Sequence, residues 1–227
     1  MSKCWVCNLG LIEYPKAFEL QTRLAALRFN KAIDDIVLLL EHPATVTLGK
    51  FGKKENVLLS DEELGKNNIS LYRSNRGGDA TFHCPGQLII YPIMDMRQRE
   101  GNLRRFLTQL EEVVISVTRT FGIPGERWPE HPGIWVEGKQ IAAIGLHFVR
   151  GISMHGISLN VNPDLDKFKV INLCGIAGKE ATSIARLKNE NICVEDPTGR
   201  ALDAFSDVFG VQPEPISGRQ VLEDVFG

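Results

Sequence analysis

Apolar residues divide the chain into short strand-like runs and a few stretches with helical spacing. Short continuous runs of apolar and β-branched residues predict buried strands. We expect such strands at residues 3–9, 36–40, 45–48, 69–72, 88–91, 134–136, 139–144 and 152–161. Glu137-Gly138 is the expected turn between two of them. The number of strands predicts at least one substantial β-sheet.

Helical spacing is clearest between Asn102, a predicted N-cap, and Gly122, a predicted end, because apolar residues follow one face of this stretch. A second helix is expected after Tyr14-Pro15, where proline occupies the permitted first turn. Shorter helices should follow Ser60, Pro197 and Ser217, and 164–170 is either a short helix or a loop. We therefore expect one α/β core, in which residues 186–227 form a small helical appendage.

Composition narrows the class of protein. The 227 residues are 43% hydrophobic and 24% charged, as in ordinary globular proteins. A formal net charge of -2 gives no support to a nucleic-acid binder. Neither a signal-peptide pattern nor an apolar run of membrane-spanning length is evident, so we expect a cytoplasmic protein that does not bind membranes.

The cysteines give no disulfide framework, because there are five of them at irregular spacing. Cys4 and Cys7 form a C-x-x-C pair without a second pair at zinc-site spacing. We expect the pair to belong to a strand and predict no metal site.

The most polar stretch of a segment expected to be buried runs from Arg76 to Tyr91. It begins with a cation and two glycines, where backbone amides can approach a ligand closely. Arg76, Thr81, His83 and Gln87 are residue types that are costly to bury. The pattern is compatible with a tight turn, but this cluster favours a ligand-binding loop that leads into a strand.

Cys174 lies in a glycine-rich loop, and an exposed thiol near cations is reactive. The residues alone favour the other interpretation, a small buried hydrophobic side chain. The sequence contains no P-loop, zinc-protease or serine-hydrolase motif.

The polar stretch reads Arg-Gly-Gly-x-x-Thr-Phe-His-x-x-Gly-Gln-x-Ile-x-Tyr, which resembles the signature of the octanoyltransferases of lipoate synthesis. Asn172-Leu173-Cys174-Gly175 is similar to the active-site Asn-x-Cys-Gly of that family, although proline usually stands where Leu173 does. Residues 143–145 and 155–161 resemble its remaining acyl-binding segments, so the resemblance spans about residues 35–185.

The resemblance implies the mixed-sheet fold with flanking helices of biotin and lipoate protein ligases. It implies an acyltransferase without a cofactor that moves octanoyl from octanoyl-acyl carrier protein to a lysine, through a thioester on Cys174. The implied acceptors are lipoyl domains of 2-oxoacid dehydrogenase complexes and the glycine cleavage H protein. The implied acyl site consists of Arg76, Gly77, Gly78, Asp79, Ala80, Thr81, Phe82, His83, Ala143, Ile144, Gly145, Gly156, Ile157 and Ser158.

One departure concerns the catalytic lysine of the family, whose position in the motif holds Gln140 here, with Lys139 one residue earlier. Neighbouring strand residues face opposite sides, so Lys139 reaches the site only if a bulge at Glu137-Gly138 shifts it. Because glutamine cannot carry a proton, the chemistry favours Lys139 as acid and base. An ATP-dependent lipoate ligase and a non-catalytic binding protein are the alternative readings.

Two arginines at the start of the predicted 103–121 helix, Arg104 and Arg105, oppose the helix dipole. With Arg97 and Arg99 they are candidates for a patch that binds acidic carrier proteins.

Overall fold

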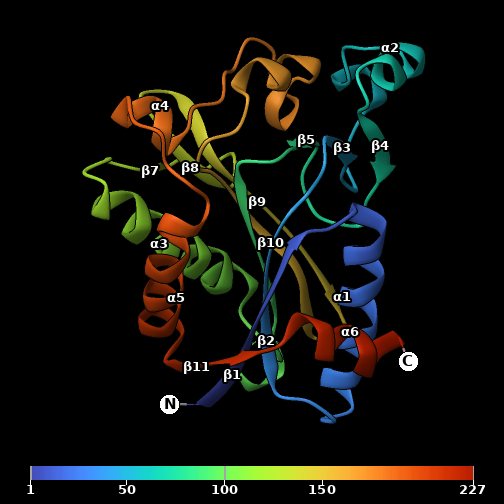
Figure 1. Ribbon diagram of the computed structural model, residues 1–227, viewed down its shortest axis with the longest axis vertical. Coiled ribbons are helices and arrows are strands. Elements are labelled where there is room, and N and C mark those ends of the chain that lie inside the picture. The colour runs from blue at the N-terminus through green and yellow to red at the C-terminus, as the bar shows by residue number, and fades with distance from the viewer. Residues whose placement is uncertain (1, 100, 227) are drawn as a thin grey trace.

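A computed structural model describes residues 2–99 and 101–226, so the ends of the predicted domain, Met1 and Gly227, lie outside the described residues. The larger of its two sheets has eight strands in the order β11-β1-β2-β6-β10-β9-β8-β7 (Figure 1). The strands are β1 (Ser2–Leu11), β2 (Asp35–Glu41), β6 (Gln87–Ile93), β7 (Glu126–Arg127), β8 (Gly133–Val136), β9 (Lys139–Val149), β10 (Ile152–Asn160) and β11 (Val211–Ile216). β1 pairs in parallel with β2 and β11, and the remaining pairs are antiparallel, so the sheet is mixed.

Helices cover both faces of this sheet. The helices α1 (Tyr14–Phe29) and α6 (Gly218–Phe226) lie on one face, and α3 (Leu103–Thr120) and α5 (Glu195–Phe209) lie on the other (Figure 1). The apolar stripe of α3 forms one core with the inner residues of β9 and β10, whereas α1 packs on β2 and β6. Because both faces are covered, central strands such as β2 and β10 are buried along nearly their whole length.

A smaller sheet stands beside one end of the large one. It consists of β3 (Thr45–Leu48) between β4 (Ser70–Arg73) and β5 (Ala80–His83), and it has a core of its own. The short helix α2 (Asp61–Lys66) follows Ser60, as expected, and Ser60 forms a capping box with Glu63. The remaining short helices are η1 (Lys54–Asn56), η2 (Met96–Gln98), η3 (Leu165–Val170), η4 (Leu173–Gly175) and α4 (Ile184–Lys188).

The C-terminal segment differs from the expected helical appendage, because β11 is a strand of the main sheet. Pro213 and Pro215 hide this strand from a sequence reading, since proline cannot donate to a ladder. Among the described strands, β11 pairs with β1 alone and therefore lies at an edge, where proline is tolerated. Cys4 and Cys7 are buried in β1, as the strand interpretation predicts. In the part of the chain that the structure describes, no helix is both long enough and apolar enough to cross a bilayer.

Candidate active site

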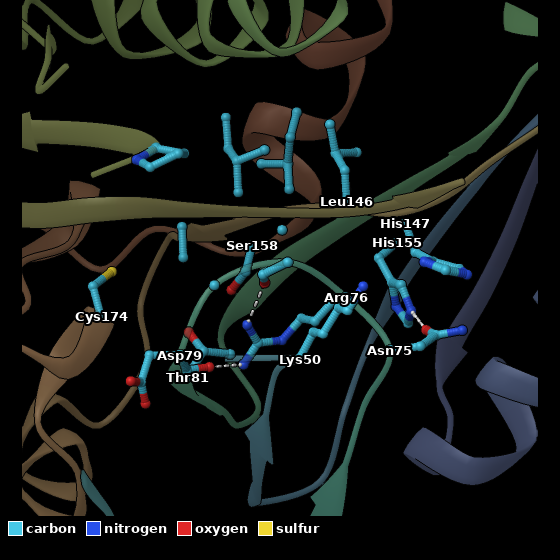
Figure 2. Close-up of a pocket in the computed structure, with 18 of the residues that line it drawn as sticks. Lys50, Asn75, Arg76, Asp79, Thr81, Leu146, His147, His155, Ser158 and Cys174 are labelled. Atoms are coloured by element: carbon cyan, nitrogen blue, oxygen red, sulfur yellow. Dashed lines mark hydrogen bonds between the residues drawn. The ribbon is translucent and has the colours of Figure 1, made fainter. Parts of the chain in front are cut away.

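A cavity of about 580 Å³ lies between the two sheets, lined by β9, β10, the segment before β5 and the first turns of α3. Figure 2 shows Cys174 and Asp79 at one end, Arg76 in the middle, and the hydrogen-bonded pair His155 and Asn75 at the other end. The residues that line the cavity are mostly apolar or glycine on the β9 and β10 side, including Ala143, Ile144, Gly145, Leu146, Gly156 and Ile157. Such a cavity suits a long apolar group with a polar end.

The structure brings together nearly all the residues that the sequence singled out. Arg76 to Thr81, His83, Ala143 to Gly145, Gly156 to Ser158 and Cys174 all line the cavity. Phe82 does not. It belongs to the buried core of the small sheet and packs edge-on against Phe168, because alternate residues of β5 face opposite sides. The predicted loop is therefore partly a strand, with Thr81 and His83 on the cavity side.

Arg76 organises the wall of the cavity. Its buried guanidinium donates from Nε to Thr47 Oγ1 at 3.0 Å, and from Nη2 to Thr47 O at 2.6 Å and Asp79 O at 2.7 Å. Gly145 gives it room, since a Cβ there would lie 3.0 Å from Arg76 Cδ and 3.2 Å from Gly77 O. The arginine thus fixes the backbone from Gly77 to Asp79 and keeps a positive charge beside the cavity.

Cys174 lies at the tip of a tight turn with φ of 54° and ψ of 22°, a left-handed conformation that costs a non-glycine residue roughly 1–3 kcal/mol. Hydrogen bonds within the turn and to a neighbouring segment hold it in place. Gly175 N donates to Asn172 O at 3.0 Å, and Asn172 is bound through its backbone and side chain to Asn56. Leu173, in place of the usual proline, anchors the turn in the core of the small sheet. The strained conformation presents the thiol to the cavity.

Gln140 is the side chain that reaches the thiol. Its Nε2 donates to Cys174 Sγ at 3.2 Å, and the residue is buried. Burial raises the pKa of the Cys174 thiol, and this effect outweighs the Gln140 hydrogen bond and the positive charge of Arg76, which both lower it. Asp79 adds to the rise. The thiol is therefore mostly protonated near neutral pH.

Lys139 lies elsewhere, and the expectation that a bulge brings it to Cys174 is wrong. Glu137 and Gly138, both at positive φ, form a tight two-residue turn, so Val136 pairs with Lys139 and Trp135 with Gln140. The bulge of β9 falls after Gln140, because the next paired residues are Ile134 and Ala142. Lys139 Nζ instead pairs with Glu180 at 2.6 Å, and its side chain is 53% exposed.

Three buried histidines stand behind or beside the cavity. Burial lowers the pKa of His42 to about 4 and that of His155 to about 3, and it lowers the pKa of His83 well below the usual value. His42 Nδ1 donates to Ile12 O at 2.7 Å, so its Nε2 accepts from the Tyr91 hydroxyl at 3.0 Å. All three rings are uncharged at neutral pH.

The sequence reading missed several residues that line the cavity. Tyr14, Lys50, Leu103, Leu107 and His147 come from segments interpreted only as helices, strands or loops. The sequence does indicate Leu103 and Leu107, because they form an i,i+4 apolar pair at the N-terminal end of the apolar face of α3. Leu103 is 53% exposed rather than part of the core.

Arg104 and Arg105, on the first turn of α3, border a separate hollow of about 590 Å³ that Arg127 also lines. Arg127 is neutralised by Glu111 and Glu112, at 3.2 and 2.6 Å. Because Leu103 of the same turn lines the main cavity, these arginines stand near its mouth. Arg97 forms an ion pair with Asp95, and Arg99 forms one with Asp35, so both side chains have a structural role.

Comparison of the chain with known proteins gives concordant results. The profile of the lipoyl protein ligase A/B catalytic domain matches residues 13–206. An octanoyltransferase of Caldicellulosiruptor bescii is 40% identical over 223 residues, which cover 97% of each chain. An octanoyltransferase of Thermosynechococcus vestitus is 42% identical over 212 residues, covering 93% of this chain and 92% of the relative.

Solved structures share the fold at low sequence identity. A bipartite lipoate protein ligase of Thermoplasma acidophilum, studied with its E2 lipoyl domain, superimposes with a TM-score of 0.74 and 15% identity, covering 100% of this chain and 92% of the ligase. Lipoate-protein ligase A bound with ATP gives a TM-score of 0.72 at 15% identity, covering 99% of this chain and 94% of the ligase. The biotin protein ligase of Aquifex aeolicus gives 0.51 at 13% identity, covering 92% and 70%.

The architecture is therefore the catalytic fold of lipoate and biotin protein ligases, as predicted. The chain belongs to the lipoyl protein ligase A/B catalytic-domain family and, within it, to the octanoyltransferases, which are acyltransferases of protein lipoylation. These results confirm the family and the activity that the Arg76–Tyr91 motif predicted.

Proposed function

We propose that this enzyme takes octanoyl from octanoyl-acyl carrier protein, holds it as a thioester on Cys174, and passes it to a lysine of a lipoyl domain. The observation that carries the proposal is the Cys174 thiol, which faces the largely apolar cavity and accepts a hydrogen bond from Gln140 at 3.2 Å. The acceptor is supported by the T. acidophilum ligase with its lipoyl domain. We propose lipoyl domains of 2-oxoacid dehydrogenases and the glycine cleavage H protein as acceptors.

In the first half-reaction, the Cys174 sulfur attacks the carbonyl carbon of the carrier thioester. The new C–S bond forms, the bond to the carrier sulfur breaks, and the thiol proton ends on the departing carrier thiol. The thiolate is the nucleophile in such exchanges, so the raised pKa of Cys174 leaves only a small reactive fraction near neutral pH. The reaction needs a free thiol, so we place the enzyme in a reducing compartment, the cytoplasm.

Gln140 is the group that assists this step. Its amide N–H lies within hydrogen-bond distance of Sγ, so it stabilises the thiolate and stands beside the carbon that Sγ attacks. A donor in this place also stabilises the oxyanion that develops on that carbon, an effect worth roughly 10²–10³ in rate in hydrolases. A neutral amide does not act as a general acid or base, and the Lys139 ammonium is paired with Glu180.

In the second half-reaction, the lysine nitrogen attacks the Cys174 thioester. The C–N bond forms and the C–S bond breaks. The acceptor enters as an ammonium and becomes an amide, so it loses two protons. One proton restores the Cys174 thiol and the other leaves the site. The overall reaction therefore releases one proton for each octanoyl group transferred.

The test is intact-mass measurement after the enzyme is mixed with octanoyl-acyl carrier protein, without nucleotide. The wild type should gain one octanoyl group, which is lost when apo lipoyl domain is added, and Cys174→Ser should gain none while keeping its fold. An adduct on Cys84 or Cys193 would refute the assignment of the nucleophile. A reaction that required ATP would instead indicate a ligase, and binding without transfer would indicate a non-catalytic protein.

A further inference from the structure

The cavity contains one carboxylate whose role the proposed half-reactions leave open. Among the described residues that line the cavity, Asp79 is the only acidic one, whereas Arg76 and Lys50 are cationic. The lysine that accepts the acyl group enters as an ammonium, because its ordinary pKa is about 10.4. An ammonium beside Arg76 is repelled unless an anion compensates it.

Asp79 lies close to the turn that carries Cys174. A Cβ built on Gly175 would approach Asp79 Oδ2 to 2.9 Å, so the carboxylate lies directly against this turn. Figure 2 shows the Asp79 and Cys174 side chains at the same end of the cavity. A nucleophile that attacks the Cys174 thioester therefore arrives beside the Asp79 carboxylate.

The carboxylate is held in a fixed orientation. Oδ1 accepts from Ala80 N at 2.7 Å and from Lys53 N at 3.4 Å, and Oδ2 accepts from Asn56 Nδ2 at 2.9 Å. Asn56 is in turn bound to Asn172 of the Cys174 turn. Two carboxylate oxygens offer about four acceptor positions, so this arrangement leaves capacity for a further donor. The side chain is half-buried, which leaves it accessible from the cavity.

We propose that Asp79 receives the ammonium of the acceptor lysine beside the acylated Cys174, an inference that rests on the thioester route proposed above. The ammonium binds to the carboxylate and loses one proton through it to solvent, which frees the lone pair of the nitrogen. The resulting amine then attacks the thioester carbon and forms the C–N bond. The C–S bond breaks, and the second proton ends on Cys174 Sγ, which balances the step.

The structure also allows a purely structural role, in which Asp79 only holds the turn through Asn56. The two roles differ in their dependence on the charge of the nucleophile. Loss of an ammonium-binding carboxylate slows attack by lysine and not attack by an uncharged amine. Loss of a turn-holding residue slows both, because the thioester itself is displaced.

The experiment uses wild type, Asp79→Asn, Asp79→Ser and Asn56→Ala, each acylated with octanoyl-carrier protein and followed by intact mass. The acyl-enzymes are then given either apo lipoyl domain or hydroxylamine, which is uncharged near neutral pH. Both Asp79 variants should acylate, which also shows that they fold. They should then transfer to the lipoyl domain about 10- to 100-fold more slowly, the usual value of one hydrogen bond to a charged group. Hydroxylamine cleavage should stay within about threefold of wild type, and Asn56→Ala should slow both nucleophiles to a similar extent.

Equal slowing with both nucleophiles in the Asp79 variants, or slowing with neither, would overturn the proposal. Failure of the thioester route has a different signature, namely wild-type enzyme that octanoylates the lipoyl domain without any Cys174 adduct. In that case the steady-state KM for the lipoyl domain still decides the role of Asp79. A tenfold or greater rise in that KM in Asp79→Asn supports ammonium binding, and an unchanged KM excludes it.

Discussion

Replacement of Gln140 by lysine tests the electrostatics of the site most directly. In this structure the thiol faces a neutral amide, and the nearest lysine in sequence, Lys139, is paired with Glu180. Gln140→Lys should place an ammonium next to Cys174 Sγ, because the two side chains differ little in length. The position is buried, 3% exposed, so the new charge interacts with the thiolate at close range.

The size of the expected pKa shift follows from the short distance between residue 140 and the Cys174 sulfur. At a separation of about 4 Å and an effective dielectric constant of about 20, two opposite charges attract by ~4 kcal/mol, which corresponds to ~3 pKa units. Burying the ammonium opposes part of this gain. We therefore expect Gln140→Lys to lower the pKa of Cys174 by about 1–2 units from a value that burial has raised.

The assay is the pH dependence of iodoacetamide alkylation, with modification at Cys174 followed by peptide mass. Because Cys193 is exposed, the measurement is made in a Cys193→Ser background. Gln140→Met, which removes the hydrogen bond without adding charge, should raise the pKa of Cys174. Lys139→Ala should leave it unchanged. An alkylation profile that responded to Lys139→Ala and not to Gln140→Lys would refute the observed placement of the two residues.

Three further predictions concern the acyl slot, the carrier and acid stability. Each buried methylene contributes about 0.8 kcal/mol, roughly fourfold in kcat/KM, so kcat/KM should be about 200-fold higher for an octanoyl donor than for a butanoyl donor. A kcat/KM that does not change with chain length would contradict an enclosed apolar cavity. Replacing Arg104 and Arg105 by glutamate should raise the KM for the acidic carrier protein and weaken the salt dependence of this KM. A small thioester donor serves as the control and should react as before. Unchanged kinetics with the carrier protein would exclude Arg104 and Arg105 as its binding surface. Burial keeps the pKa of His42 at about 4 and of His155 at about 3, so the unfolded chain, titrating near 6.5, takes up these protons first as pH falls. Each of the three buried histidines, His83 included, should then cost about 2 kcal/mol of unfolding free energy at pH 5, measured by urea titration. His155→Asn, which tolerates the positive φ at this position, should remove one such share of about 2 kcal/mol, and equal pH dependence in the two proteins would contradict the prediction.

Much of this fold follows from local patterns in the sequence. The α3 stripe has a clear helical period, Ser60 and the acids after it mark the start of a helix, and β2 is a short continuous apolar run between polar residues. The elements that were missed lack such patterns. β11 contains two prolines and depends on its pairing with β1, a partner about 200 residues away, so its strand character is a tertiary effect.

The residues of the site also fall into those that the sequence indicates and those that only the tertiary structure reveals. The polar stretch from Arg76 to His83 and the glycine-flanked Cys174 are visible in the sequence because they combine residue types that are costly to bury or strained. Tyr14, Leu103 and Leu107 line the same cavity, yet they are ordinary helix residues, and only the tertiary packing brings them there. Asp79 belongs to the predicted polar stretch. That it is the one acidic residue beside two cations becomes apparent only from the described residues that line the whole cavity.

The position of Lys139 shows how one residue of strand register decides the chemistry. A lysine and a glutamine are adjacent at the start of β9, and they necessarily face opposite sides of the strand. The tight turn at Glu137 and Gly138 leaves no extra residue before them, so the glutamine faces the thiol. The choice between the two residues therefore lies in the turn geometry and in where the bulge falls. Only a bulge before Lys139 would reverse it, and the bulge lies after Gln140. The thiol consequently has a neutral donor as its direct partner, which is why the proton lost by the incoming ammonium needs another acceptor, the role that we propose for Asp79.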